Sequence, residues 1–89
     1  MIEKILDKYY AKKLEAKIKN SLSLYCIDKS FIYSKSIISL YVKNKKWKDD
    51  CYTLIMAIPY EECFELLIDN KRYISLIKDI EYFINKELN

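Results

Sequence analysis

Apolar and polar residues recur along the chain with two different periods, and the change of period separates helices from strands. In residues 2–19, apolar side chains return at steps of three and four with lysines between them, which predicts an amphipathic helix with a basic outer face. Asn20 and Ser21 are expected to end this helix. From residue 22 the period is two and the residues are β-branched or aromatic, which predicts strands.

Three strands are predicted. The first covers residues 22–27 and ends at a turn over residues 28–30, the second covers 37–43, and the third covers 51–58. Residues 44–49 form a polar connection of hairpin length, so the second and third strands are expected to pair antiparallel. Residues 31–33 fit either a strand extension or a buried loop, and the pattern does not choose between them.

Two helices complete the chain. Pro59 followed by acidic residues is typical of a helix start, and the helix is expected over residues 60–69 with Tyr60, Cys63, Phe64 and Leu67 facing inward. Asn70 is expected to end it in a left-handed conformation. The last helix, over residues 72–87, has an apolar stripe of Tyr73, Leu76, Ile77, Ile80, Phe83 and Ile84.

The order is therefore α-β-β-β-α-α. It predicts an α+β fold in which a three-stranded antiparallel sheet packs against the helices. No linker, repeat or low-complexity segment interrupts the pattern, so residues 1–89 are expected to form a single domain.

The net charge of +3 hides a divided chain: residues 1–48 carry a net +8 and residues 49–89 a net −5. Such a division suits a protein that works by docking onto charged partners. Fifteen of the sixteen basic residues are lysines and only Arg72 is arginine, which argues against sequence-specific nucleic-acid recognition, because arginine is preferred for bidentate base contacts.

Composition also excludes several classes of chemistry. The chain has no glycine and therefore no glycine-rich phosphate loop, and no histidine, the commonest general acid or base. Cys26, Cys51 and Cys63 are far apart and lack the paired spacing of zinc ligands. We therefore expect no enzyme activity, no catalytic residue, no metal site and no cofactor, and we expect the three thiols to be reduced and buried.

A membrane location is not expected. The longest nearly apolar run, residues 51–60, is about half of a membrane span, and the first residues do not resemble a signal sequence. The expectation is a soluble protein in the cytoplasm of a host cell.

The candidate partner-binding residues are lysines and one tryptophan. The connection between the second and third strands places cations around an aromatic residue, which combines electrostatic steering with a large rigid contact. Two lysines on the basic face of the first helix extend this set, although a solvated turn and a solvated helix face are the commoner explanations of such groups. The predicted site comprises Lys43, Lys45, Lys46, Trp47, Lys48, Lys8 and Lys12.

In element order and in two short segments, Ser36-Ile37-Ile38-Ser39-Leu40 and Glu87-Leu88-Asn89, the chain resembles small phage-encoded anti-CRISPR proteins. The resemblance implies a non-enzymatic inhibitor that binds a CRISPR effector complex or its guide RNA. The family member with this element order is acidic and imitates DNA, whereas this chain is net basic, so neither that mechanism nor any binding residue carries over.

Two functions are therefore expected to compete. The first is a small protein-binding inhibitor from a phage or other mobile element, acting by stoichiometric docking. The alternative is a non-specific nucleic-acid-binding accessory protein with a Lys-rich face, whose affinity would fall steeply with salt.

Overall fold

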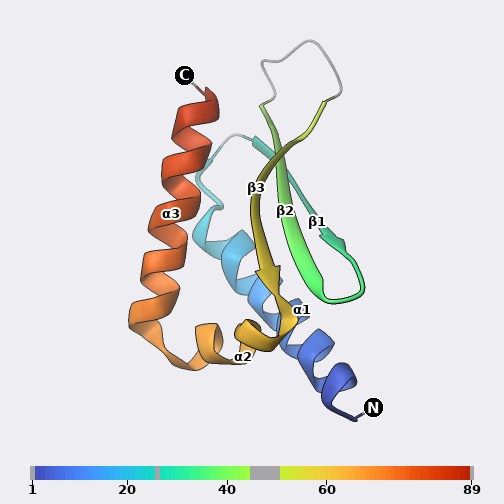
Figure 1. Cartoon of the computed structure of the whole chain (residues 1–89). Helices are drawn as coiled ribbons and strands as arrows, with labels where there is room; N and C mark the ends of the chain where they lie inside the picture. Colours follow the sequence, from blue (N-terminus) through green and yellow to red (C-terminus); the bar gives the residue numbers. More distant parts are fainter. Residues whose placement is uncertain (1, 26, 45–50, 89) are drawn as a thin grey trace.

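The computed structural model describes residues 2–25, 27–44 and 51–88 and has the expected α+β order (Figure 1). The sheet is antiparallel throughout, with strand order β1-β2-β3. The elements are α1 (Ile2–Ser21), β1 (Ile27–Tyr33), β2 (Ile37–Asn44), β3 (Thr53–Pro59), α2 (Tyr60–Ile68) and α3 (Asn70–Leu88).

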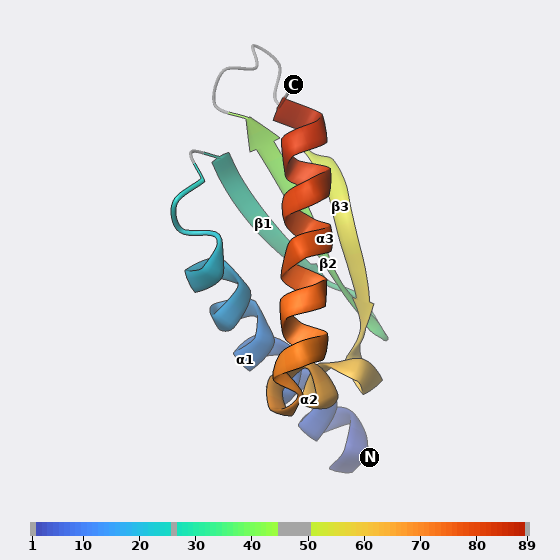
Figure 2. The ribbon, with the colours of Figure 1, turned by 90° about the vertical axis from the view of Figure 1, so that its left-hand side faces the viewer.

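The molecule has two layers. Helices α1 and α3 lie on one side of the sheet (Figure 2), and α2 connects the end of β3 to α3. One cluster of buried side chains lies between the layers and draws on all six elements. Its members are Ala11, Leu14, Ile18, Leu22, Ile27, Ile38, Leu40, Val42, Ile55, Ile58, Tyr60, Cys63, Leu66, Tyr73, Ile80 and Ile84.

The first strand lies further along the chain than predicted. Residues 22–25 form a turn, and β1 runs from Ile27 through the segment expected to be a turn as far as Tyr33. Leu22 is the first residue of this turn, directly after α1; its backbone N–H donates to the Ile18 carbonyl at 3.0 Å and its side chain is buried. Tertiary pairing explains the rest: each residue of β1 has a partner on β2, from Ile27 opposite Asn44 onward. Residues 31–33 are thus a strand extension.

A β-bulge alters the third strand. Leu40 pairs with Met56 but the next residue, Tyr41, pairs with Leu54, so Ile55 is the extra residue. The bulge lets Ile55 and Ile58 both face the core, which strict alternation forbids.

The sequence analysis expected a buried Cys51 thiol in a strand that starts at residue 51. That prediction is wrong: β3 begins at Thr53, and the Cys51 thiol is free and exposed. Cys63 is free and buried as expected, and Cys26 lies outside the described residues.

Asp69 separates the last two helices by a different mechanism from the one predicted. Its backbone is extended, with φ −102° and ψ 99°. None of the described residues has a positive φ. The Asp69 carboxylate Oδ1 accepts hydrogen bonds from the backbone N–H groups of Lys71 at 3.1 Å and Arg72 at 3.3 Å. A side-chain cap on α3 therefore replaces the expected left-handed residue.

The inward faces of these helices also differ from the prediction. Leu66 is buried in α2, Leu67 is half-buried, and Phe64, expected to face inward, is exposed. In α3, Phe83 is exposed as well. In both helices the buried stripe is therefore narrower than the stripe of apolar residues in the sequence.

Tyrosine hydroxyls join elements that are distant in sequence. Each supplies a directional contact that apolar packing lacks. Tyr33 donates to Glu15 Oε1 at 2.5 Å, Tyr25 donates to Glu81 Oε2 at 3.0 Å, Tyr73 donates to the Lys17 carbonyl at 3.0 Å, and Tyr60 donates to the Ser34 carbonyl.

No helix among the described residues has both the length and the apolar content that a membrane span requires.

We predict that Tyr60→Phe lowers the free energy of unfolding by about 1 kcal/mol, because the largely buried Tyr60 side chain loses its hydrogen bond to the Ser34 carbonyl while the ring remains. Urea denaturation measures the change. Tyr82→Phe is the matched control, because the Tyr82 side chain is exposed on α3. Equal effects of the two substitutions would contradict a structural role for the Tyr60 hydroxyl.

A second prediction concerns acid stability. Burial alone would raise the pKa of Glu15, but hydrogen bonds with Lys19 and Tyr33 outweigh it and lower that pKa from 4.5. A carboxyl whose pKa is lower in the folded state adds stability above its unfolded pKa and loses it as pH falls. Glu15→Gln should therefore be less stable than the parent at neutral pH, and the difference should shrink between about pH 6 and about pH 2. Denaturation of both proteins, with Asp79→Asn as an exposed control, gives the comparison; a difference independent of pH would count against the ion pair.

Candidate functional site

The structure describes three of the seven predicted partner-binding residues. Lys8 and Lys12 lie exposed on α1, and Lys43 lies half-buried near the end of β2, opposite Asp28 of β1. Lys45, Lys46, Trp47 and Lys48 lie outside the described residues, so the binding role of that connection stays a prediction.

The described members do not form one site. Lys8 lines a hollow together with Ser36, at the start of β2. Lys43 is seven residues further along, which is roughly 23 Å in an extended strand. Lys43 and Lys8 therefore belong to opposite ends of the sheet.

Most of the other described lysines of α1 are used within the fold. Lys13 lies 5.0 Å from the centre of the Tyr9 ring and Lys17 lies 4.0 Å from that of Tyr73. Lys19 forms an ion pair with Glu15 at 2.8 Å, the pair that its i,i+4 spacing predicts. Because these three lysines contact other residues of the fold, fewer lysines of α1 are available to a partner than the sequence suggests.

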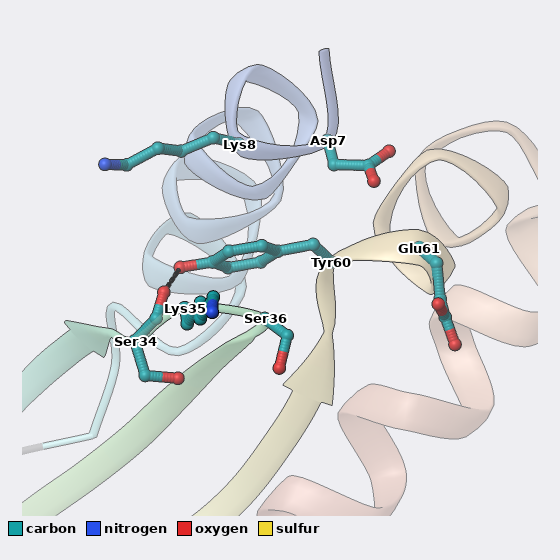
Figure 3. Close-up of a pocket in the computed structure, with 7 residues that line it drawn as sticks. All are labelled: Asp7, Lys8, Ser34, Lys35, Ser36, Tyr60 and Glu61. Carbon is teal, nitrogen blue, oxygen red and sulfur yellow. Dashed lines mark hydrogen bonds between the residues drawn. The ribbon is translucent and has the colours of Figure 1, made fainter. Parts of the chain in front are cut away.

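The hollow that contains Lys8 lies where α1, the β1–β2 turn and the start of α2 meet (Figure 3). Its volume is about 340 Å³. The lining residues are Asp7, Lys8, Ser34, Lys35, Ser36, Tyr60 and Glu61. In Figure 3 the Tyr60 ring extends across the hollow toward Ser34, with the carboxylates of Asp7 and Glu61 on the other side from the Lys8 amine.

Tyr60 fixes the shape of this hollow. Besides the hydroxyl contact with Ser34, its backbone N–H donates to the Ser36 carbonyl at 3.0 Å. The ring also lies 6.3 Å from that of Tyr33. One residue at the start of α2 therefore holds the hairpin turn from two directions, which makes the wall rigid.

A second hollow of about 290 Å³ adjoins the first. It is lined by Leu6, Asp7, Tyr10, Glu61 and Phe64, so Asp7 and Glu61 belong to both. The Tyr10 and Phe64 rings lie 4.8 Å apart, which joins α1 to α2 at the apolar wall.

Beside this wall lies a surface that we call the α1–α2 apolar surface, formed by Leu6, Tyr9 and Phe64. Their exposed fractions are 44%, 52% and 44%. Large side chains so exposed next to a hollow are typical of binding sites.

The sequence prediction missed this surface because it counted Leu6, Tyr9 and Phe64 as core residues. A signal was present. At 100° per residue, Tyr9 lies on the opposite side of α1 from the buried Ile18, so the apolar residues of this helix spread over more than one buried face.

Nothing in the described site is arranged for nucleophilic catalysis. Burial, together with the negative charges of Asp7 and Glu62, raises the pKa of the Cys63 thiol to about 11. The thiol is therefore protonated near neutral pH, and it donates weakly to the Pro59 carbonyl at 3.6 Å. Within the described residues no group of three or more histidine, cysteine or carboxylate side chains could hold a metal ion.

Comparisons with protein-family models, with curated proteins and with solved structures found no match for this chain.

The two described thiols should react differently. Iodoacetamide is expected to modify Cys51 in the folded protein and to modify Cys63 only after unfolding in urea, because Cys63 is buried and its thiolate is scarce. Peptide mass spectrometry measures each position separately. Rapid modification of Cys63 in the folded protein would show that the α1–α2 packing is looser than described.

Proposed function

We propose that this protein is a non-catalytic binding protein that acts by docking onto a protein partner. The observation that carries the proposal is the α1–α2 apolar surface beside the two joined hollows. Each of these three side chains leaves about half of its surface in water and so forgoes about half of the roughly 1.5–3 kcal/mol that full burial contributes. Contact with a partner would recover this free energy.

The joined hollows add the polar part of such a contact. Lys8 and Lys35 supply cations, while Asp7 and Glu61 supply carboxylates. An apolar centre with charged residues around it is the usual organisation of a protein–protein interface. The residues come from α1, the β1–β2 turn and α2, which the two Tyr60 hydrogen bonds and the Tyr10–Phe64 ring contact hold together, so the backbone of the site is assembled before a partner binds.

The resemblance to anti-CRISPR proteins gives this proposal a specific form: a phage or mobile-element inhibitor that binds a CRISPR effector complex stoichiometrically. Lys8, one of the residues predicted from the sequence, would belong to the contact.

Purified effector–guide complexes of several types provide the test. The parent protein should suppress target cleavage by one of them, with inhibition complete near a one-to-one ratio. Tyr9→Ala combined with Phe64→Ala should weaken binding by roughly 2 kcal/mol or more, the range of aromatic hot spots. Tyr82→Ala, which removes one exposed ring from α3, serves as the control and should bind normally.

Circular dichroism and thermal melting keep folding separate from binding. If the double variant stays folded and inhibits as well as the parent, the α1–α2 apolar surface is not the docking site. The docking proposal fails as a whole on two results together. No effector complex is inhibited, and the parent and the double variant capture the same proteins from the native host in equal amounts.

Non-specific nucleic-acid binding is the second candidate. Lys8 and Lys12 are exposed on α1, and Lys35 in the hairpin turn lines the same hollow as Lys8. Fluorescence anisotropy with labelled DNA and RNA at increasing salt separates the candidates, because phosphate contacts lose affinity steeply with salt and docking through aromatic residues does not.

A further inference from the structure

The second hollow, beside the α1–α2 apolar surface, combines an aromatic wall with two carboxylates. It has a volume of about 290 Å³ and is lined by Leu6, Asp7 and Tyr10 of α1 and by Glu61 and Phe64 of α2. Leu6 and Phe64 also belong to the α1–α2 apolar surface and are exposed. A partner segment that covers this surface can therefore place one of its side chains in the hollow.

The charge of this hollow is unbalanced within the protein. Of the residues that line it, Asp7 and Glu61 are charged, and both are negative. Neither carboxylate forms an ion pair or a hydrogen bond with another of the described residues. Lys8 lines the first hollow instead, and its amine lies on the other side of that hollow from the two carboxylates (Figure 3). An external cation would balance the charge.

The aromatic wall favours a cation as well. The ring centres of Tyr10 and Phe64 lie 4.8 Å apart, with an angle of 55° between the ring planes. The face of an aromatic ring attracts cations, and α1 already contains such a contact, because the Lys13 amine lies 5.0 Å from the centre of the Tyr9 ring. Rings and carboxylates in one hollow therefore select for positive charge.

We propose that the second hollow binds an arginine side chain of the protein partner; this inference rests on the docking function proposed above. A guanidinium group is planar, stacks on aromatic rings and has five N–H donors, which can serve more than one carboxylate oxygen. The aliphatic part of the side chain would pack against Leu6 and the rings. A lysine ammonium carries the same charge but is more strongly hydrated, so it is expected to bind less tightly.

The arginine comes from another protein and not from a second copy of this chain. Arg72 is the only arginine in the sequence, and its guanidinium already pairs with the Glu65 carboxylate. Phosphate groups are disfavoured in this hollow, because Asp7 and Glu61 would repel them. The second hollow thus suits a protein partner better than a nucleic acid.

Three capped tripeptides that differ only in the central residue provide the test. They are acetyl-Leu-X-Leu-amides in which X is arginine, lysine or citrulline, the uncharged analogue of arginine. NMR titration of the isotope-labelled protein gives each dissociation constant and shows which backbone amides respond. The measurements are made in about 0.1 M salt, which screens exposed charges more than about 10 Å apart.

The arginine peptide should bind with a dissociation constant of about 1 mM, as its small size allows. The citrulline peptide should bind at least about fivefold more weakly, because it lacks the charge-assisted hydrogen bonds and the cation–π contact. The lysine peptide should lie between them. The amide signals that shift should be those of Leu6, Asp7, Tyr10, Glu61 and Phe64.

A charge-neutral variant tests the carboxylates. Asp7→Asn combined with Glu61→Gln keeps the side-chain shapes, and it should bind the arginine peptide no more tightly than the citrulline peptide. Asp79→Asn combined with Glu87→Gln is the matched control: it removes two negative charges from exposed positions of α3 and should keep the preference for arginine. Circular dichroism confirms that each variant is folded.

Equal binding of the arginine and citrulline peptides overturns the inference, as does no binding of either. An equal loss of arginine binding in the two charge variants also overturns it. A lysine peptide that binds as tightly as the arginine peptide would show that the hollow accepts any cation and that the choice of arginine is wrong.

Failure of this inference is distinguishable from failure of the docking function. If a partner captured by the parent is lost by Tyr9→Ala with Phe64→Ala but retained by Asp7→Asn with Glu61→Gln, docking stands and the arginine contact is wrong. If capture yields no partner although peptide selectivity depends on Asp7 and Glu61, the hollow selects arginine as inferred and the docking function fails.

Discussion

The sheet has two faces, and the chain supplies helices for only one of them. Burial of that face organises the whole structure: the inward residues of β1, β2 and β3 meet those of α1, α2 and α3 in a single cluster. A two-layer molecule of 89 residues has a large surface for its volume, so apolar residues that exceed the capacity of this cluster must remain exposed. Among the described residues they include Ile32 and Leu54 of the sheet, Leu6, Tyr9 and Phe64 of the α1–α2 apolar surface, and Tyr82 and Phe83 of α3.

Tyrosines hold the two layers in register. An apolar contact between a helix and a sheet tolerates sliding, whereas a hydroxyl that donates to one carbonyl or carboxylate does not. Tyr33 ties β1 to α1, Tyr73 ties α3 to α1, and Tyr60 ties α2 to the hairpin turn. The abundance of tyrosine over phenylalanine in this chain therefore has a structural reason, which composition alone does not reveal.

Sequence periodicity predicted the order of the elements because that order depends on local pattern. It failed where a tertiary partner decides the outcome. The segment from Asp28 to Ser30 looks like a turn, but β2 offers it a pairing partner and it becomes a strand. Ile55 faces the core only because of a bulge, whose position depends on the pairing with Leu40 and Tyr41. Where the local sequence is compatible with more than one secondary structure, the paired strand decides which one forms.

The candidate site shows the same limit. Charge pattern identified Lys8 but could not place it beside Lys35, because the two meet only through the fold. Phe64 and Tyr9 were assigned to the core on their hydrophobicity, although a helix packed on one side can bury only one stripe. Each helix here packs against the rest of the molecule on one side only, so the apolar residues outside its buried stripe remain exposed.

Charged residues lie beside the α1–α2 apolar surface and give the proposed contact its selectivity. Asp7 and Glu61 line both hollows, and Lys8 and Lys35 line the first. In a protein–protein interface the apolar centre contributes most of the contact free energy, while the arrangement of the surrounding charges decides which partner fits. The carboxylates and the Lys8 amine lie on opposite sides of the first hollow (Figure 3). A partner whose surface carried charge of one sign only would therefore meet like charge on one side, so a docking partner would have to present both signs.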